Sequence, residues 1–246
     1  MQIFEMVEKP LLSVIIPAYN EGSRLPETLP QVIEFVAGQP YEAEIIVVDN
    51  NSSDDTREIA ERLGADFPFV KVLSETIQGK GAAVRTGMRG ANGEYLFMAD
   101  ADLSMPIPEV GKFLPPLLDD YDVAIASREV DGAVRYDEPG YRHLMGRVFN
   151  LVVKVFAVPG FQDTQAGFKC FRREAALDIL NSQTIDGWAF DVELLFIARR
   201  RGYRIVEVPI NWYYRSNSRI NPLGDAIEMF KEVVGIRING WRGIYD

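Results

Sequence analysis

The sequence contains only one cysteine and one histidine among its 246 residues, Cys170 and His143. A single cysteine cannot form a disulfide within the chain, which is typical of proteins from a reducing compartment. One histidine leaves little material for a histidine-based nucleophilic triad or a His-rich zinc site. No apolar run approaches the about 20 residues that a membrane-spanning helix requires. The opening MQIFEMVEKP also lacks the basic-then-apolar pattern of a secretory signal peptide, so we expect neither a leader nor a spanning helix.

Basic residues are in deficit, with 26 Lys and Arg against 36 Asp and Glu and a formal net charge of −10. A protein that binds duplex nucleic acid needs a basic face, so nucleic acid is not an expected partner. The acidic total still permits a local group of cations that holds phosphates. Hydrophobic residues make up 47% of the chain, which is ample for the core of one large domain.

The stretch GEYLFMADADLSMPIP, residues 93–108, is the most informative in the chain. Residues 95–99 form a short apolar run of strand type that leads into Asp100 and Asp102, and Pro106 and Pro108 prevent further pairing. Side chains two positions apart along a strand point to the same side, roughly 7 Å apart. Two such carboxylates repel each other unless a cation gathers there, and hard oxygen ligands favour Mg²⁺ or Mn²⁺. The sequence therefore predicts a metal site at Asp100 and Asp102, with a solvated acidic turn as the alternative.

Apolar strand-like runs alternate with helical patterns through the first half of the chain. This alternation predicts an α/β fold with a mainly parallel sheet covered by helices on both faces. The expected strands are 11–16, 44–49, 70–73, 95–99 and 122–127, and the expected helices include 25–36, 81–88 and 108–118. Ligands bind such sheets beyond the carboxyl ends of the strands. The residues placed on that rim are Asn20, Asp49, Asp100, Asp102 and Arg128.

The second half is less regular, and we expect one domain with a regular half over about 10–128 and an irregular half over about 129–246. A helix over 143–158 is predicted to carry a narrow basic stripe on an otherwise apolar surface. The polar positions of this stripe are His143, Arg147, Asn150 and Lys154. A further helix over 188–201, a strand over 204–208 and a helix beginning at 221–222 complete the expected elements.

Two other stretches carry candidate site residues. Gly79-Lys80-Gly81 fits neither the P-loop nor the dinucleotide fingerprint, which leaves a flexible turn with a cation at the start of a helix. The N-terminus of that helix can hold an anion, and the alternative is a surface lysine beside a helix-starting glycine. In residues 188–193, Trp188 precedes Asp191, for which either helix capping or a role in a pocket is open.

Six segments of the chain form an informative set: LSVIIPAYNE (12–21), VVDNNSSD (47–54), DAD (100–102), ASR (126–128), DTQAGFK (163–169) and WAFD (188–191). Taken together, these segments resemble a family 2 glycosyltransferase of the GT-A fold. Within that family the chain is similar to the branch that makes dolichyl- or polyprenyl-phosphate sugars, nearest the dolichyl-phosphate glucose synthases. The resemblance extends over roughly residues 10–220 and is far more specific than any single triplet.

The resemblance implies that the residues over about 10–128 form a nucleotide-sugar-binding half and those over about 129–246 an acceptor-binding half. It also implies roles for particular residues. Pro17, Tyr19, Glu21 and Asp49 would hold the nucleoside of a UDP- or GDP-sugar, with Lys80 as a further candidate on the donor side. Asp100 would meet the ribose or diphosphate, and Asp102 would bind the Mg²⁺ or Mn²⁺ ion. The residues implied to gather the acceptor phosphate are Arg128, Arg142 and either Arg215 or Arg219.

The chain departs from the family pattern at three places. Asn50-Asn51 replaces the usual Asp-Gly of the second loop. Ser104 stands where some lipid-phosphate mannosyltransferases carry a metal-contacting Gln. Residues 214–219 are shorter than the corresponding basic segment of the family, which leaves Arg215 and Arg219 as alternatives.

The implied reaction is the inverting transfer of glucose or mannose to a polyprenyl or dolichyl phosphate. An acceptor phosphate is ionised at neutral pH and needs no protein base, so catalysis comes from positioning and charge neutralisation. A soluble hydroxyl acceptor would instead need a carboxylate base, for which Asp191 is the candidate. The further alternatives are a sugar-nucleotide-binding protein without turnover and a nucleotidyltransferase.

A lipid-phosphate acceptor also predicts a cytoplasmic enzyme that lies peripherally at the inner face of the membrane. The apolar surface of the helix over 143–158 is the predicted contact with the bilayer. In the alternative, this helix packs into the core or into a dimer interface.

Overall fold

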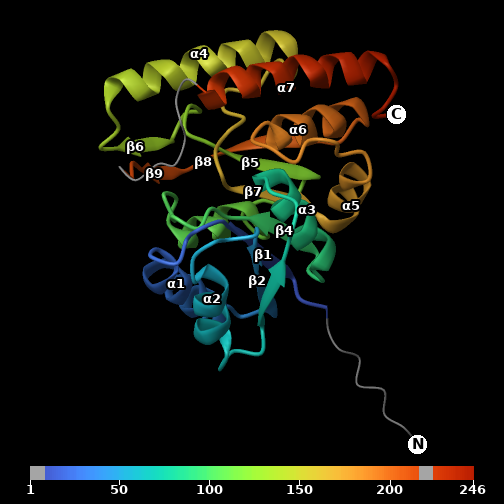
Figure 1. Ribbon diagram of the computed structural model, residues 1–246. Coiled ribbons are helices and arrows are strands. Elements are labelled where there is room, and N and C mark those ends of the chain that lie inside the picture. Colours follow the sequence, from blue (N-terminus) through green and yellow to red (C-terminus); the bar gives the residue numbers. More distant parts are fainter. Residues whose placement is uncertain (1–8, 216–223) are drawn as a thin grey trace, which may run out of the picture.

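The computed structural model describes residues 9–215 and 224–246. They form a seven-stranded sheet with the order β3-β2-β1-β4-β7-β5-β8 and a separate pair of strands, β6 and β9 (Figure 1). The strands are β1 (Leu12–Ala18), β2 (Ala43–Asp49), β3 (Val70–Ser74), β4 (Tyr95–Met98), β5 (Val123–Ser127), β6 (Val134–Tyr136), β7 (Lys169–Arg172), β8 (Ile205–Pro209) and β9 (Asn211–Tyr213). All pairings in the large sheet are parallel except those of β7, which runs antiparallel to both β4 and β5. The predicted α/β class with a mainly parallel sheet is confirmed.

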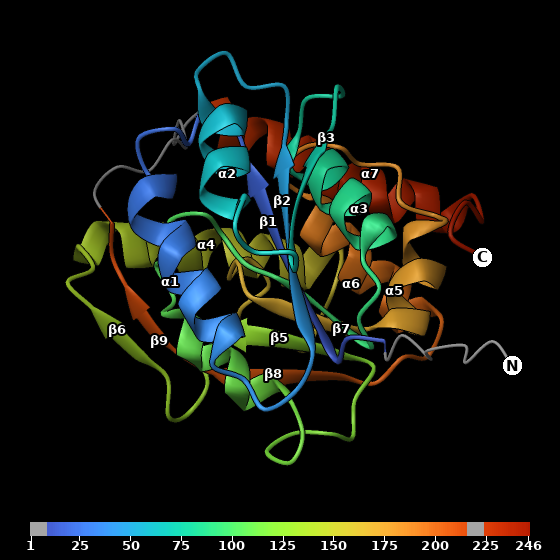
Figure 2. The same ribbon diagram turned by 90° about the horizontal axis from the view of Figure 1, so that it is seen from below.

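Helices cover both faces of the sheet because alternate side chains of each strand point to opposite faces. Along β1, Val14 and Ile16 join the core beneath α1, α2 and the short 3-10 helix η1. Ile15 joins the core on the other face, beneath α3, α5 and α6 (Figure 2). The helices are α1 (Leu25–Ala37), α2 (Thr56–Gly64), α3 (Lys80–Gly90), η1 (Ile107–Phe113), α4 (Gly140–Phe156), α5 (Arg173–Leu180), α6 (Phe190–Arg200) and α7 (Gly224–Trp241).

The predicted helix over 108–118 is wrong in type and length. The chain forms only the short 3-10 helix η1, over Ile107–Phe113, and leaves it before Pro115 and Pro116. A proline ring excludes the preceding residue from helical geometry and removes a backbone donor. The pair of prolines therefore ends the helical segment well before residue 118.

Helices α4 and α7 pack against each other along one side of the molecule, outside α6 (Figure 1). The predicted basic stripe on α4 is wrong at Asn150, which is 9% exposed and donates its side-chain N–H to the Gln162 carbonyl. Arg147 is paired with Glu129 at 2.9 Å, so part of the stripe's charge is neutralised within the protein. In the described part of the chain, no helix is both long enough and apolar enough to cross a bilayer.

Candidate active site

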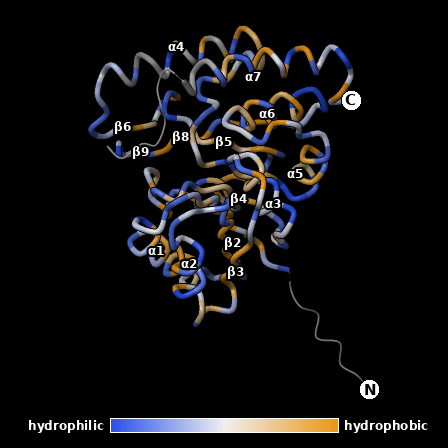
Figure 3. Tube along the Cα trace, in the orientation of Figure 1, coloured by the Kyte–Doolittle hydropathy of each residue, from blue (hydrophilic) through white to orange (hydrophobic). Residues whose placement is uncertain are grey.

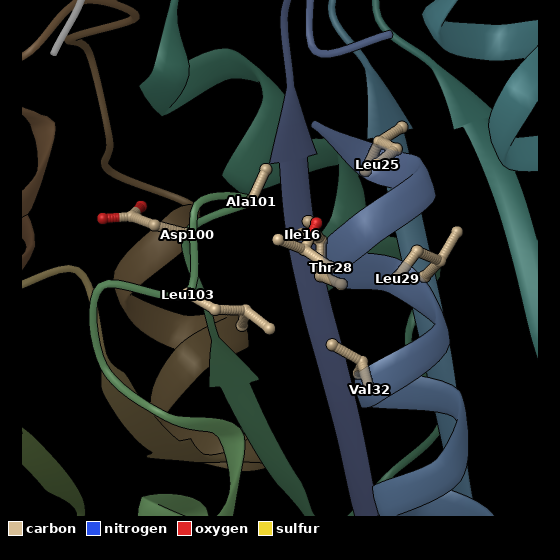
Figure 4. A pocket seen from close by; sticks show the side chains of 8 residues that line it. All are labelled: Ile16, Leu25, Thr28, Leu29, Val32, Asp100, Ala101 and Leu103. Atoms are coloured by element: carbon tan, nitrogen blue, oxygen red, sulfur yellow. The ribbon is translucent and has the colours of Figure 1, made fainter. Parts of the chain in front are cut away.

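The turn after β4 places the two aspartates of the D-x-D motif. Asp100 and Asp102 lie beyond the end of the strand, in a turn closed by a hydrogen bond from Leu103 N–H to the Asp100 carbonyl at 3.2 Å. The alternation of side chains along a strand, from which we predicted their positions, therefore does not apply to these two aspartates. Figure 4 shows Leu103 directed toward α1, where it lines a small apolar pocket, and the Asp100 carboxylate directed away from that helix. The buried Leu103 anchors the turn and leaves Asp100 facing the carboxyl edge of the sheet.

Lys80 supplies the cation that meets Asp100. Its Nζ lies 2.5 Å from Asp100 Oδ1, and the two side chains are only 22% and 28% exposed. Burial alone would lower the pKa of Lys80, but the attraction of Asp100 outweighs burial and leaves this pKa above its ordinary value. In the same way, Lys80 outweighs the effect of burial on Asp100 and lowers the pKa of that carboxyl. Both groups are therefore charged, and the pair is a preformed arrangement of opposite charges.

The N-terminus of α3 is not open to an anion, contrary to the sequence-based expectation. The N–H groups of Gly81 and Ala82 donate to the Asp186 carbonyl at 2.8 and 3.3 Å. The approach is so close that a Cβ at Gly79 would lie 2.1 Å from this carbonyl oxygen. The glycines at 79 and 81 thus serve close packing between two backbone segments, and the Lys80 side chain is the group that faces the site.

A glycine from the DTQAGFK segment packs against the D-x-D turn. A Cβ at Gly167 would lie 1.8 Å from Asp100 Oδ2. Any side chain at residue 167 would therefore force the Asp100 carboxylate to move.

We expect the variant Gly167→Ala to lose at least about tenfold in kcat/KM, because displacing a positioned carboxylate by 1 Å is costly. Steady-state kinetics on the folded variant measures this loss. Gly111→Ala is the matched control, because a Cβ at Gly111 meets nothing within 4 Å. Equal activity of the two variants would contradict the packing argument.

Lys169 is a site residue that the sequence did not single out. Because β7 is antiparallel to its neighbours, its first residue lies at their carboxyl ends, with Lys169 opposite Met98 of β4. The Lys169 side chain is fully buried, and its Nζ lies 2.7 Å from the Ala166 carbonyl and 3.2 Å from Asp191 Oδ2. Asp191, in the first turn of α6, is thus tethered by a buried ammonium group.

Arg128 forms the third cationic centre of the site, directly after β5. Its guanidinium makes two hydrogen bonds to Asp163, at 2.7 and 3.0 Å, and lies 5.4 Å from the centre of the Trp212 ring. Burial alone would raise the pKa of Asp163, but Arg128 outweighs burial and holds this pKa at about 2. Asp163 and Trp212 are further residues that sequence reasoning missed, although Asp163 begins the DTQAGFK segment.

The residues predicted to hold the nucleoside lie at the ends of β1 and β2. Pro17 is in β1, Tyr19 is 44% exposed just beyond it, and Asp49 is buried at the end of β2. Glu21 is also buried and forms an ion pair with Arg24 at 2.7 Å. The structure brings these side chains to one edge of the sheet, and their roles in binding remain predictions.

The departure at Asn50-Asn51 has a structural reason. Asn50 donates to the carbonyls of Glu75 and Ile77 and accepts from Gly79 N–H, with distances of 3.3, 2.6 and 2.8 Å. An aspartate could not make these donations, so Asn50 joins the second loop to the Lys80 turn in a way that the usual residue cannot. Asn51 has a φ of +58°, a region in which asparagine is the best substitute for glycine.

The residues predicted for the acceptor phosphate are only partly described. Arg142 lies in the first turn of α4, and Arg215 is an exposed residue just after β9. Arg219 lies outside the described residues. β9 is nonetheless joined to the D-x-D turn, because Tyr213 N–H donates to the Ser104 carbonyl at 2.7 Å and Ser104 N–H donates to Asp102 Oδ1 at 2.9 Å.

The chain matches the family model described as Glycosyl transferase family 2 over residues 13–180. Several relatives bear the name dolichyl-phosphate beta-glucosyltransferase. The protein from Homo sapiens is 33% identical over 95% of this chain and 77% of its own length. Those from Drosophila melanogaster and Saccharomyces cerevisiae are 35% and 32% identical, over 94% and 97% of this chain and 77% of their own lengths. The chain belongs to glycosyltransferase family 2, as the motifs predicted.

Solved structures of glucosyl-3-phosphoglycerate synthase from Mycobacterium tuberculosis share the fold. The complex with Mn²⁺, UDP and phosphoglyceric acid has a TM-score of 0.66 at 20% identity and covers 94% of this chain and 78% of that one. The complex with Mn²⁺, UDP-glucose and phosphoglyceric acid has a TM-score of 0.62 at 21% identity, covering 94% and 79%. This likeness supports the α/β assignment.

Proposed function

We propose that the protein transfers glucose from UDP-glucose to a dolichyl or other polyprenyl phosphate, with inversion at the anomeric carbon. The observation that carries the proposal is the group of charges around Asp100. Lys80 contacts this carboxylate, and Lys169 and Arg128 lie close enough to lower its pKa further. The reaction brings together a diphosphate and a second phosphate. The half-buried Lys80 and Arg128, beside two carboxylates that could hold a metal ion, suit that combination. The names of the relatives support glucose and a dolichyl-phosphate acceptor, and the ligands of the solved structures support UDP.

The donor side of the site fits a divalent cation. Within residues 9–215 and 224–246, no group of three or more His, Cys, Asp and Glu side chains is arranged to hold a metal by itself. Mg²⁺ and Mn²⁺ commonly use one or two carboxylates together with substrate phosphates, and Asp102 with Asp100 offers that set. A bound ion would neutralise charge that develops on the leaving UDP. In this proposal, Lys80 keeps Asp100 compensated before the donor arrives and then contacts the diphosphate.

The acceptor side needs cations rather than a base. The acceptor phosphate carries its own negative charge, so Arg128 would hold it in line with the anomeric carbon. Asp191 is paired with the buried Lys169 at 3.2 Å, which restrains its side chain. This tether argues against Asp191 as the mobile base that a soluble hydroxyl acceptor would require. Asp191 is better suited to hold a sugar hydroxyl.

A product assay separates these alternatives. The protein is incubated with UDP-glucose or GDP-mannose and with a short polyprenyl phosphate or the matching polyprenol. We expect product only from UDP-glucose with the phosphate. Transfer to polyprenol at a comparable rate would contradict the phosphate-acceptor mechanism, and nucleotide binding without any transfer would favour a non-catalytic protein.

The proposal includes a membrane surface, because the tail of a polyprenyl phosphate stays in the bilayer. Two adjacent helices present exposed apolar side chains, and hydrophobic stretches recur along both (Figure 3). The exposed apolar side chains form one stripe along each helix. The rings of Phe156 on α4 and Phe230 on α7 lie 5.8 Å apart and join these two apolar stripes. The exposed members are Tyr141, Val148, Leu151, Val155 and Phe156 on α4, and Phe230, Ile238 and Trp241 on α7. Exposed Lys231, Arg237 and Arg242 flank the α7 stripe, which offsets the acidic net charge locally. We propose docking at the cytoplasmic face.

Replacing Leu151 and Val155 by Ser is expected to release the protein from vesicles while leaving it folded. These side chains are 60% and 66% exposed, so their removal costs little core packing but deletes apolar contact with lipid. Flotation with vesicles of zwitterionic and anionic lipid measures the bound fraction. Leu117→Ser is the control, because Leu117 is 73% exposed but belongs to the segment after η1 rather than to α4 or α7. Flotation that is equal in all three proteins would contradict the proposed surface.

A further inference from the structure

The segment between α5 and α6, residues 181–189, forms the wall against which the Lys80 turn rests. Within this segment, the Asp186 carbonyl accepts hydrogen bonds from the N–H groups of Gly81 and Ala82. The Gln183 side chain donates to the Gly81 carbonyl at 3.1 Å. The Trp188 ring of this segment lies 6.0 Å from Lys80 Nζ. The position of Lys80, and with it the ion pair between Lys80 and Asp100, therefore depends on the contacts that fix this wall in place.

On the side away from the Lys80 turn, the wall is anchored by the fully buried carboxylate of Glu193 in α6. Glu193 accepts hydrogen bonds from Thr184 N–H at 3.1 Å, from Thr184 Oγ1 at 2.5 Å and from Ile185 N–H at 2.9 Å. Glu193 is buried without a cation within ion-pairing distance in the described chain, so donated hydrogen bonds are what satisfy its carboxyl oxygens. None of the donor or acceptor chemistry of the proposed reaction uses this residue.

The remaining donor to Glu193 comes from the other end of the chain. Tyr245, which follows α7, is fully buried, and its hydroxyl donates to Glu193 Oε1 at 2.7 Å. Burial raises the pKa of Tyr245 to about 12, so the hydroxyl keeps its proton and remains a donor. The same helix α7 supplies Glu232, which accepts from Ala189 N–H at 3.0 Å at the other end of the wall.

We propose that Tyr245 is a positioning residue for the donor site, acting through Glu193 and the 181–189 wall on the Lys80 turn. This inference rests on the proposed function only in taking Lys80 as a donor-binding group. Two sets of hydrogen bonds form the physical link, and the peptide bond between Ile185 and Asp186 joins them. Tyr245, Thr184 and Ile185 donate to Glu193, and the Gly81 and Ala82 amides donate to the Asp186 carbonyl. Loss of the hydroxyl leaves the Glu193 carboxyl oxygens with fewer donors, so the carboxylate and the wall it holds shift together.

The test is the variant Tyr245→Phe, which removes one oxygen and keeps the packed ring. We expect UDP to bind about threefold to tenfold more weakly by calorimetry, at a temperature well below unfolding, with KM for the donor raised more than kcat is lowered. Amide hydrogen exchange of Gly81, Ala82, Thr184 and Ile185 is expected to speed up. Tyr203→Phe is the matched control, because Tyr203 lies just beyond the C-terminal end of α6 and its hydroxyl also donates to a carboxylate, that of Asp178 in α5, at 2.9 Å.

A double-mutant cycle with Lys80→Ala identifies the route. If Tyr245 acts through Lys80, Tyr245→Phe has no further effect on UDP affinity once Lys80 is replaced. A Tyr245→Phe protein that unfolds at a lower temperature but keeps parental UDP affinity and parental exchange at Gly81 and Ala82 would overturn the proposal. Equal losses of affinity in both backgrounds would overturn it as well. If Lys80→Ala alone leaves UDP affinity unchanged, the donor-site assignment is wrong, and the exchange measurement still decides whether Tyr245 controls the wall.

Discussion

Replacing Asp102 by Asn is expected to lower kcat by about 10²–10³-fold, because one positioned charge in an active site contributes roughly that much. Asparagine has nearly the same shape, and its side-chain oxygen can still accept the hydrogen bond that Ser104 N–H donates to Asp102 Oδ1. The turn should therefore survive the change. What is lost is the negative charge that binds Mg²⁺ or Mn²⁺, and with the ion goes the neutralisation of the leaving UDP. Kinetics with UDP-glucose and a polyprenyl phosphate measures the effect.

The control for this prediction is Asp66→Asn, an exposed carboxylate in the loop after α2. It changes the net charge by the same amount and is expected to leave kcat within about twofold of the parent. Chelation with EDTA should reduce turnover of the parent to the level of Asp102→Asn, and added Mn²⁺ or Mg²⁺ should restore the parent but not the variant. Turnover that persists at the parental rate in EDTA would contradict a metal role for Asp102.

All strands of the large sheet except β7, and their order along the chain, could be predicted because their residues are apolar in continuous runs. β1, β2, β4 and β5 each begin and end within about two residues of the expected positions. The rim that carries Asp49, Asp100 and Arg128 follows directly, since parallel strands bring their carboxyl ends to one edge. These conclusions need only local pattern and a general rule of sheet topology.

Pairings between distant segments could not be predicted in this way. The strand β7 is only four residues long, and nothing in KCFR shows that it inserts antiparallel between β4 and β5. That insertion is what brings Lys169 and Gly167 to the D-x-D turn. The same holds for the Asp186 carbonyl, which occupies the N-terminus of α3 from about one hundred residues away in sequence. A glycine such as Gly167 indicates from sequence only that another part of the chain packs closely against it, and not which residue that is.

Arg128 poses a different problem, because it is both a candidate for the acceptor phosphate and half of a buried ion pair. The Asp163 side chain is 5% exposed and the Arg128 side chain 21%. Removing one partner of such a pair costs about 3–5 kcal/mol of stability, because the other charge is left buried and uncompensated. The single variant Arg128→Ala therefore cannot distinguish a catalytic role from a structural one.

The double variant Arg128→Ala/Asp163→Asn separates the two roles. The backbone N–H groups of residues 128 and 165 donate to Asp163 Oδ2 and Oδ1 at 3.1 Å each. Asparagine at 163 has a single side-chain oxygen and keeps one of these two hydrogen bonds. With both charges gone, the unfolding temperature should recover most of what Arg128→Ala loses. If Arg128 binds the acceptor phosphate, transfer should nevertheless stay about 10- to 100-fold below that of Asp163→Asn alone, the cost of a lost charge-assisted contact.

Three measurements complete this comparison: thermal unfolding, UDP affinity and the rate of transfer to a polyprenyl phosphate. UDP affinity in the double variant is expected to equal that of Asp163→Asn, because Arg128 faces the acceptor rather than the donor in this mechanism. A double variant that is as active as Asp163→Asn would make Arg128 a purely structural partner of Asp163. In that case the acceptor phosphate would have to be held by other cations, and Lys169 is not free for it, since its ammonium group is already bound between the Ala166 carbonyl and Asp191.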